Sequence, residues 1–341
     1  MVLLSQSLIE MGYEIYFITN EFVGCYDSND KHWYKKGLRT YRQNKRFKFL
    51  FSIFYALRSL YFVNADVYFQ RAPGAITGII SLFCKLKKKK FCYMVASSQD
   101  VNRNYINNTN KRNKVLYEFG LNNADAIIVQ TNEFKKLLFE NHMRESYFIR
   151  DGIRIPENIL STKKRKYITF IGGIRPVKNP EIFIELAKNF PGNTFLMIGG
   201  SLTDETYFKF VKKSAQKEKN IIFKGHLKRD KIGHYLSQSM ILVNTSDREG
   251  LPNTITEAWS YGVPVIGFKI NPDNLLMGDL GFYCEGDFNL MVKYINELIG
   301  NSDTHEKMSG KCLKYVINNH NIDNISKQIN KVLKTDLANN H

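Results

Sequence analysis

The chain has 341 residues, a hydrophobic content of 43% and a formal net charge of +17. This length predicts two domains, and the hydrophobic content is enough for two cores. The sequence has no run of 18 or more uncharged apolar residues, which excludes a membrane span. Its five cysteines form no C-x-x-C pair, so neither a zinc site nor a disulfide framework is expected.

The positive charge is concentrated in the first half of the sequence. Residues 1–150 hold 23 Lys+Arg against 12 Asp+Glu, a balance of +11, whereas residues 151–341 have a balance of +6. A basic protein can bind nucleic acid, anionic lipid or an anionic substrate, although a lysine-rich composition explains part of the excess. Since no nucleic-acid-binding motif occurs, we expect no nucleic-acid partner. The first residues resemble no secretion signal, so we expect a cytoplasmic location.

The N-terminal region contains a basic and an apolar stretch side by side in the sequence. Residues 2–10 look helical, and Tyr13–Thr19 looks like a strand. Residues 31–48 then hold eight basic residues interleaved with aromatics, and the apolar helix candidate Phe49–Phe62 follows. Residues 31–62 therefore have the composition of a segment that lies on an anionic membrane surface. The alternative is a core helix behind a solvated loop, which is favoured for Phe49–Phe62 but not for the basic run.

The rest of the first half alternates between apolar strands and helices. Strands are predicted at Ala65–Gln70, Phe91–Ala96 and Ala126–Gln130, with helical segments between them, as in a parallel α/β sheet. Ser98 and Asp100 follow the second of these strands. We interpret them as loop-capping residues rather than as contacts to a substrate.

A charge run at Lys163–Lys166 looks like a linker, and we expect domains at residues 1–158 and 159–319. The strand Tyr167–Ile171 then leads into the sequence GGIRPVKNP. Gly172 and Gly173 would let backbone N–H groups approach an anion closely, and Arg175 and Lys178 would supply positive charge. The loop is neither a G-x-G-x-x-G fingerprint nor a Walker loop.

The most informative stretch, Ser246–Gly267, reads SDREGLPNTITEAWSYGVPVIG and follows the apolar run Met240–Val243. A helix is expected from Asn253, with Ile255, Ala258 and Trp259 on its buried face and an end near Gly262. Its free N-terminal N–H groups attract anions, phosphates above all.

Two carboxylates, Glu249 and Glu257, stand at either side of that helix start. A carboxylate there suits hydroxyl groups rather than phosphate, and a spacing of eight would bring both near one helix face. The pattern indicates a nucleotide sugar, in which ribose and hexose hydroxyls flank a diphosphate.

The stretches EGLPN, TEAW and YGVPVIG resemble the E-x7-E motif of the family 4 retaining glycosyltransferases of the GT-B fold, and GGxRxxK resembles that family's diphosphate anchor. The resemblance implies an α/β fold with two Rossmann-like, doubly wound domains facing a cleft. It also implies that residues 320–336 pack back on the first domain. In such proteins a strand and a glycine-rich loop precede the first helix, and this sequence has neither.

The resemblance further implies a set of site residues and a reaction. A sugar would pass from a nucleotide-diphosphate donor, such as a UDP-sugar, to a saccharide or lipid-linked saccharide acceptor in surface polysaccharide biosynthesis. The catalytic residues would be Arg175, Lys178 and Glu249. The donor-binding residues would be Gly172, Gly173, Gly250, Leu251, Asn253, Thr254 and Glu257.

No D-x-D motif occurs, so we expect no metal and no other cofactor. The protein would work in the cytoplasm, peripherally on the cytoplasmic face of the inner membrane. Two alternatives remain open: a GT-B-fold sugar-nucleotide epimerase, and a truncated nucleotide-sugar-binding protein without turnover.

Overall fold

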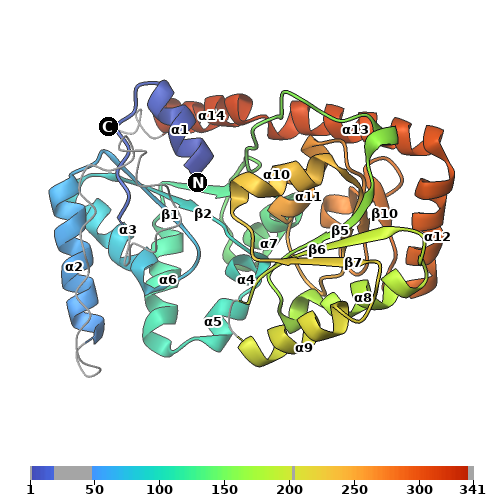
Figure 1. Cartoon of the computed structure of the whole chain (residues 1–341). Helices are drawn as coiled ribbons and strands as arrows, with labels where there is room; N and C mark the ends of the chain where they lie inside the picture. Colours follow the sequence, from blue (N-terminus) through green and yellow to red (C-terminus); the bar gives the residue numbers. More distant parts are fainter. Residues whose placement is uncertain (1, 19–47, 202–203, 337–341) are drawn as a thin grey trace. The chain divides into compact units, whose positions relative to one another are not determined.

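The computed structural model describes residues 2–18, 48–201 and 204–336. The chain divides into two compact units, each with its own parallel sheet (Figure 1). Unit 1 is Met1–Arg150 with Asp323–His341, and unit 2 is Asp151–Ile322. The segment that returns to unit 1 begins three residues after the predicted position, 320.

The boundary at Arg150 lies eight residues before the predicted one because residues after it bond to the end of unit 2. The Ile153 N–H donates to His320 O at 2.7 Å, and the Ile322 N–H donates to Ile153 O at 3.0 Å. These bonds tie residues 151–153 to the last residues of unit 2.

Unit 2 is built on six parallel strands in the order β10-β9-β8-β5-β6-β7. The strands are β5 (Tyr167–Ile171), β6 (Thr194–Ile198), β7 (Ile221–Gly225), β8 (Ser239–Asn244), β9 (Val265–Gly267) and β10 (Gly281–Tyr283). The helices are α8 (Pro180–Lys188), α9 (Glu205–Ala215), α10 (Arg229–Ser237), α11 (Asn253–Ser260), α12 (Phe288–Gly300) and α13 (Ser302–His320).

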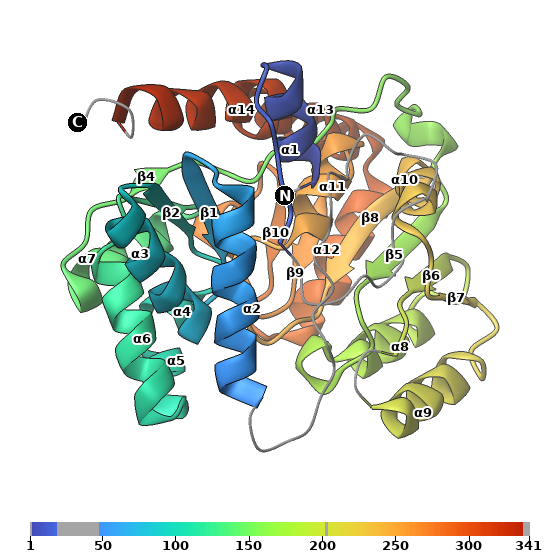
Figure 2. The ribbon, with the colours of Figure 1, turned by 90° about the vertical axis from the view of Figure 1, so that its left-hand side faces the viewer.

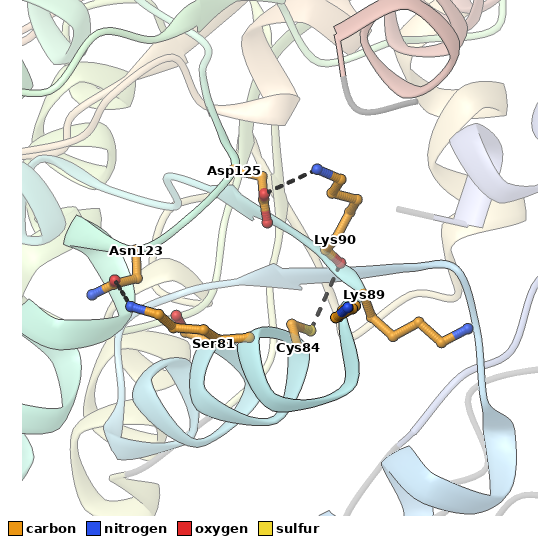
Figure 3. A pocket seen from close by; sticks show the side chains of 8 residues that line it. Ser81, Cys84, Lys89, Lys90, Asn123 and Asp125 are labelled. Carbon is orange, nitrogen blue, oxygen red and sulfur yellow. Dashed lines mark hydrogen bonds and ion pairs between the residues drawn. The ribbon is translucent and has the colours of Figure 1, made fainter. Parts of the chain in front are cut away.

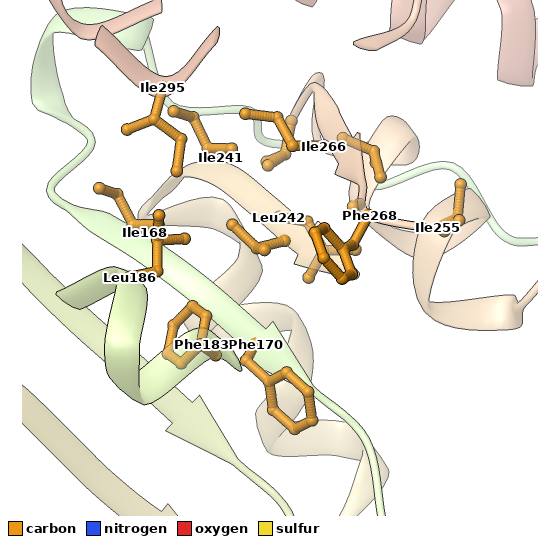
Figure 4. Close-up of a cluster of buried hydrophobic side chains, with 14 of the residues drawn as sticks. Ile168, Phe170, Phe183, Leu186, Ile241, Leu242, Ile255, Ile266, Phe268 and Ile295 are labelled. Carbon is orange, nitrogen blue, oxygen red and sulfur yellow. The ribbon is translucent and has the colours of Figure 1, made fainter. Parts of the chain in front are cut away.

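Both faces of this sheet are covered, which explains why its strands are continuous apolar runs. In Figure 1, α8 and α9 lie below the sheet and α10 and α11 lie above it. Side chains from the strands and helices meet in one core, in which Phe170 packs on Phe183 and Ile168 and Ile241 are fully buried (Figure 4). The predicted strand Tyr167–Ile171 is confirmed to the residue.

Within its described residues, unit 1 has one parallel sheet with the strand order β1-β2-β3-β4. The strands are β1 (Val67–Arg71), β2 (Lys90–Met94), β3 (Ala126–Val129) and β4 (Tyr147–Phe148). The helices are α1 (Val2–Glu10), α2 (Lys48–Val63), α3 (Ala75–Lys87), α4 (Ser98–Val101), α5 (Asn104–Asn108), α6 (Lys111–Asn122), α7 (Asn132–His142) and α14 (Ile322–Lys331).

The expected strand at Tyr13–Thr19 is wrong for its described residues, 13–18, which form irregular backbone. An apolar run becomes a strand only where a neighbouring strand supplies ladder hydrogen bonds. Here the Tyr13 hydroxyl instead donates to Asn330 Oδ1 of α14 at 2.7 Å. The basic run at residues 31–47 lies outside the described residues. No helix in the described part of the chain has both the length and the apolar character needed to cross a bilayer.

Helices α3 and α6 pack with their backbones in close contact through two glycines. A Cβ added to Gly78 would lie 2.1 Å from Leu116 O, and one added to Gly120 would lie 2.5 Å from the Thr77 carbonyl carbon. Neither neighbour can move without shifting a helix, since both are backbone atoms. This contact therefore requires glycine on each helix.

We expect Gly120→Ala to lower the free energy of unfolding by roughly 1–3 kcal/mol through overpacking. This loss should occur although alanine favours an isolated helix by about 1 kcal/mol over glycine. The matched control is Gly310→Ala in α13, where a new Cβ meets nothing within 4 Å. Urea unfolding should show opposite signs for the two variants, and equal midpoints would contradict the close contact.

Candidate functional site

The order of strands in unit 2 identifies one edge as the place for a ligand. From β5 the chain proceeds to β6 on one side, and from β8 it proceeds to β9 on the other. Neighbouring strands whose connections leave in opposite directions form a topological switch point, outside which open α/β sheets bind their ligands. Two loops start there: the glycine loop, residues 172–179, and the acidic loop, residues 245–252.

The glycine loop follows β5 and is held against the end of β6. The Gly172 N–H donates to Ile198 O and the Ile174 N–H donates to Gly200 O, both at 3.0 Å. The approach is so close that a Cβ on Gly199 would lie 2.0 Å from Gly172 O. Gly172 and Gly173 therefore lie in a turn whose backbone is held by one hydrogen bond at Gly172 and another at Ile174.

The two loops are joined by three hydrogen bonds that involve backbone atoms. The Thr245 hydroxyl donates to Lys178 O at 2.6 Å, and the Asp247 N–H donates to Val177 O at 3.0 Å. The Asn179 amide adds a bond to Thr245 O at 3.3 Å. These bonds keep the two loops together independently of their charged side chains.

Lys178 and Glu249 form an ion pair between the two loops. The Lys178 ammonium donates to Glu249 Oε1, which also accepts from the Ser246 hydroxyl. The two side chains are only 15% and 17% exposed, so solvent screens this pair less than a surface pair. The sequence had indicated separate roles for these two residues, and it gave no indication of Ser246.

Arg175 precedes the short helical turn η3 (Pro176–Lys178) in the glycine loop. Its Nε atom is buried and, within the described residues, has no hydrogen-bond acceptor. A buried guanidinium donor without a partner is uncommon, because losing its water costs free energy that no protein contact returns. This atom is therefore the part of the site that most clearly calls for an anionic ligand.

Helix α11 begins directly after the acidic loop, with half-buried Gly250 and Leu251 leading into it. Pro252 occupies its N-cap position. Because proline has no side-chain acceptor, the first N–H groups, at Asn253 and Thr254, receive no side-chain cap. Such a helix start carries partial positive charge and can bind a phosphate group.

The expected face of this helix is confirmed, since Ile255, Ala258 and Trp259 are all fully buried. The expectation that helical spacing relates Glu249 to Glu257 is wrong. Glu249 lies in the acidic loop, before the helix starts at Asn253, whereas Glu257 is half-buried in the second turn.

Two further residues lie near the site, and the sequence had not assigned either of them to it. The Lys269 ammonium, from the segment after β9, lies 2.9 Å from Asp247 Oδ1 and holds the pKa of that carboxyl below its usual value. His226 is exposed after β7, and Gly200 lies so close to it that an added Cβ would be 2.8 Å from the His226 Cβ.

Asp100 of unit 1 is fully buried rather than open to a substrate. Its carboxyl accepts hydrogen bonds from the Tyr93 hydroxyl, the Ala96 N–H and the Ser97 hydroxyl. Burial raises the pKa of this carboxyl. Its bonds hold the loop after β2, in agreement with its interpretation as a loop-capping residue.

The side chains that could bind a metal ion are scattered over the described part of the chain. In residues 2–18, 48–201 and 204–336, no three His, Cys, Asp or Glu side chains gather in a group that could hold one. The charged residues of the glycine loop and the acidic loop include the cations Arg175 and Lys178 and the carboxylate Glu249.

Comparison with known proteins connects this geometry to a family. Residues 153–312 match the family model of the glycosyl transferases group 1. The UDP-Gal:alpha-D-GlcNAc-diphosphoundecaprenol alpha-1,3-galactosyltransferase of Escherichia coli is 31% identical over 180 residues, which cover 49% of this chain and 45% of that protein. The chain spans about half of the length of the curated relatives it matches.

The structural comparisons extend to both units. Sucrose-phosphate synthase from Thermosynechococcus elongatus has a TM-score of 0.74 at 14% identity, covering 98% of this chain and 92% of that one. Anabaena HepE in complex with UDP has a TM-score of 0.69 at 15% identity, covering 83% and 82%. The predicted pair of parallel-sheet α/β domains with the GT-B fold is confirmed. Residues 153–312 thus match the glycosyl transferases group 1 family, and both units share the GT-B fold.

Proposed function

We propose that the chain transfers a sugar from a nucleotide-diphosphate donor, a UDP-sugar, to a saccharide acceptor with retention of anomeric configuration. The acceptor is a saccharide carried on a lipid, and the product serves surface polysaccharide biosynthesis. The chain would work at the cytoplasmic face of the inner membrane, where it would meet a lipid-linked acceptor. In this proposal, the catalytic residues are Arg175, Lys178 and Glu249.

The observation that carries the proposal is the buried, unpartnered Nε of Arg175. It belongs to a loop that is hydrogen-bonded to the loop preceding α11. A diphosphate is a ligand that suits both a guanidinium donor and an uncapped helix start. The name of the Escherichia coli relative supports a UDP-sugar donor and a lipid-linked acceptor, and HepE was crystallised with UDP.

The chemistry requires stabilisation of the diphosphate as the bond between sugar C1 and the phosphate oxygen breaks. Arg175, Lys178 and the first N–H groups of α11 would take up that negative charge. The departing phosphate oxygen would accept the proton of the acceptor hydroxyl, whose oxygen forms the new bond to C1 on the same face. Glu249 would hold sugar hydroxyls, and Glu257 would hold the ribose.

Because the cations of the protein itself would neutralise the diphosphate, we propose that turnover is independent of metal. Addition of EDTA should then leave the rate unchanged, in the same buffer and with the same donor. A loss of activity that Mg²⁺ or Mn²⁺ restores would reject this part of the proposal.

Replacing either partner of the Lys178–Glu249 ion pair should have a different effect on UDP binding. Lys178→Met should weaken UDP binding by roughly 1.5–3 kcal/mol, the range for a hydrogen bond to a charged group. Glu249→Gln should leave UDP binding equal or tighter, because it releases the Lys178 ammonium, while transfer from a UDP-sugar falls. Calorimetry with UDP and a transfer assay measure the two effects. Equal weakening of UDP binding in both variants would mean that the pair only holds the loops.

The proposed function is tested by titrating the purified chain with UDP, GDP and a panel of their sugars, followed by product analysis with a lipid-linked saccharide. We expect binding of UDP and of one UDP-sugar, and a new glycosidic bond with retained configuration. An altered nucleotide sugar formed without acceptor would identify an epimerase instead. Donor binding without any product would identify a binding protein.

A further inference from the structure

Helix α2 exposes the side chains that a helix in a water-soluble domain normally buries. Phe54, Leu57, Tyr61 and Phe62 are 59%, 38%, 62% and 61% exposed. Their spacing of three, four, seven and eight residues lies along one face of the helix. They therefore form a single apolar stripe rather than scattered exposed residues.

One of the buried positions of the same helix is occupied by a polar residue. Ser59 is 4% exposed and Leu60 is 3% exposed, so a serine occupies a buried position while three aromatic rings remain outside. In a helix that only packs on its own domain, the hydrophobic effect favours the reverse arrangement. The stripe is therefore suited to a partner other than the sheet of unit 1.

Helix α3 continues the surface beside α2, as Figure 2 shows in a view onto α2. Leu82 and Leu86, one turn apart on α3, are 46% and 73% exposed. The Lys87 ammonium lies 5.4 Å from the centre of the Tyr61 ring, which joins the two helices. The Arg58 guanidinium lies 4.8 Å from the Phe62 ring, so a second cation belongs to the stripe itself.

The end of α3 carries a dense group of lysines. Together with Ser81, Cys84, Asn123 and Asp125, four of them line an open pocket of about 380 Å³ (Figure 3). Those four are Lys85, Lys88, Lys89 and Lys90. Lys90 is paired with Asp125 at 3.6 Å and Lys89 with Asp66 at 3.3 Å.

Within the described residues, Lys85, Lys87 and Lys88 have no carboxylate within ion-pair distance, and Lys85 instead bonds to the Asn123 amide oxygen at 3.3 Å. An excess of exposed cations thus borders the apolar stripe. This arrangement favours an anionic partner.

We propose that this face, the α2–α3 surface, docks on an anionic lipid bilayer, with the stripe in the interfacial region and the lysines on lipid headgroups. It comprises Phe54, Leu57, Arg58, Tyr61, Phe62, Leu82 and residues 85–90. Aromatic and leucine side chains beside lysines are the composition of segments that lie in the interface plane. Charge argues against a second copy of the chain, since a two-fold contact through one face would bring the lysines of both copies together.

The test measures partition of the full chain onto vesicles of phosphatidylcholine, alone or mixed with phosphatidylglycerol. The charge variant is Lys85→Gln/Lys87→Gln/Lys88→Gln, and the stripe variant is Tyr61→Ser/Phe62→Ser/Leu86→Ser. The matched control is Lys212→Gln/Lys213→Gln/Lys217→Gln, which removes the same charge from exposed positions of unit 2. Urea unfolding checks that each variant is folded, and calorimetric titration with UDP separates membrane docking from donor binding.

We expect binding to the anionic vesicles and not to phosphatidylcholine alone. At about 5-fold for each lysine near an anionic surface, the charge variant should bind about 100-fold more weakly. The stripe variant should also bind more weakly, and its residual binding should disappear at high salt. The vesicle affinity of the control should fall less than about 10-fold, against about 100-fold for the charge variant.

Equal losses in the charge variant and the control would overturn the proposal, because the effect would then follow net charge and not this face. Full vesicle binding by the stripe variant would also overturn it. If the stripe variant instead converts a dimer into a monomer and leaves vesicle binding intact, the partner is a second copy and the bilayer proposal fails.

Discussion

Replacing Arg175 by alanine should lower kcat/KM for the nucleotide-sugar donor by roughly 30- to 1000-fold, corresponding to about 2–4 kcal/mol of lost transition-state stabilisation. The reason is that the Arg175 Nε donor is already buried without an acceptor in the unliganded chain, so it is available to the diphosphate. No reorganisation of that donor is then required when charge develops on the leaving diphosphate.

Two further variants make this expectation specific. Arg175→Lys keeps the charge but loses Nε and the planar geometry, so we expect it to restore only part of the rate. Arg154→Ala removes an exposed arginine of the same unit and should leave the rate unchanged. Wild-type turnover in Arg175→Ala, measured with saturating acceptor, would remove Arg175 from the proposed catalytic group.

Replacing Arg165 by alanine should lower the free energy of unfolding by roughly 3–5 kcal/mol, because several buried acceptors would lose their donor at once. The Arg165 guanidinium donates to Gly262 O at 2.5 Å and to Tyr261 O at 2.8 Å, at the C-terminal end of α11. It also reaches Leu160 O at 3.1 Å and Ser309 Oγ at 3.4 Å.

The Arg165 guanidinium keeps its positive charge at a place in the fold where a positive charge is stabilising. Burial lowers the pKa of Arg165 to about 10, so the side chain remains charged at neutral pH. A cation at the C-terminal end of a helix interacts favourably with the helix dipole. Arg165 therefore anchors one end of α11, whose other end begins at the proposed donor site.

The neighbouring Lys166 provides the control for this prediction, because its side chain is exposed. Its hydrogen bond to Gln238 O comes from the backbone N–H, which alanine retains. Lys166→Ala should change the urea midpoint only slightly. Arg165→Ala should unfold at a much lower urea concentration, with a similar slope if unfolding remains two-state. A midpoint within error of the unmodified chain would show that the buried carbonyl groups find other donors.

In the run Lys163–Lys166, one residue departs from what the sequence pattern predicts. As a sequence, this run looks like a solvated linker, and three of its four residues are indeed not buried. Arg165 is buried nonetheless, because carbonyl groups about 96 and 97 residues later in the chain accept its hydrogen bonds. No local pattern carries information about so distant a partner.

The exposure of the faces of α2 likewise could not be read from its local sequence. Its helical character follows from the local composition, and the predicted Phe49–Phe62 agrees with Lys48–Val63 to one residue at each end. Which of its faces is exposed depends on what α3 and the sheet leave uncovered, so the preferred interpretation as a core helix was only half right. The exposed aromatic stripe emerges only in the folded unit.

The sequence by itself determined the strand Tyr167–Ile171, the start and buried face of α11 and the two loops before and after them, because strand runs, glycines and a proline before a helix act over a few residues. It also predicted which residue types would bind a diphosphate. Only the tertiary structure decided that Lys178 pairs with Glu249, that Arg175 Nε is buried without an acceptor, and that Gly78 and Gly120 admit no side chain. The ion pair and the two glycine contacts join residues 38 to 71 positions apart in the chain, and such contacts exist only once parallel strands have brought their loops and helices together.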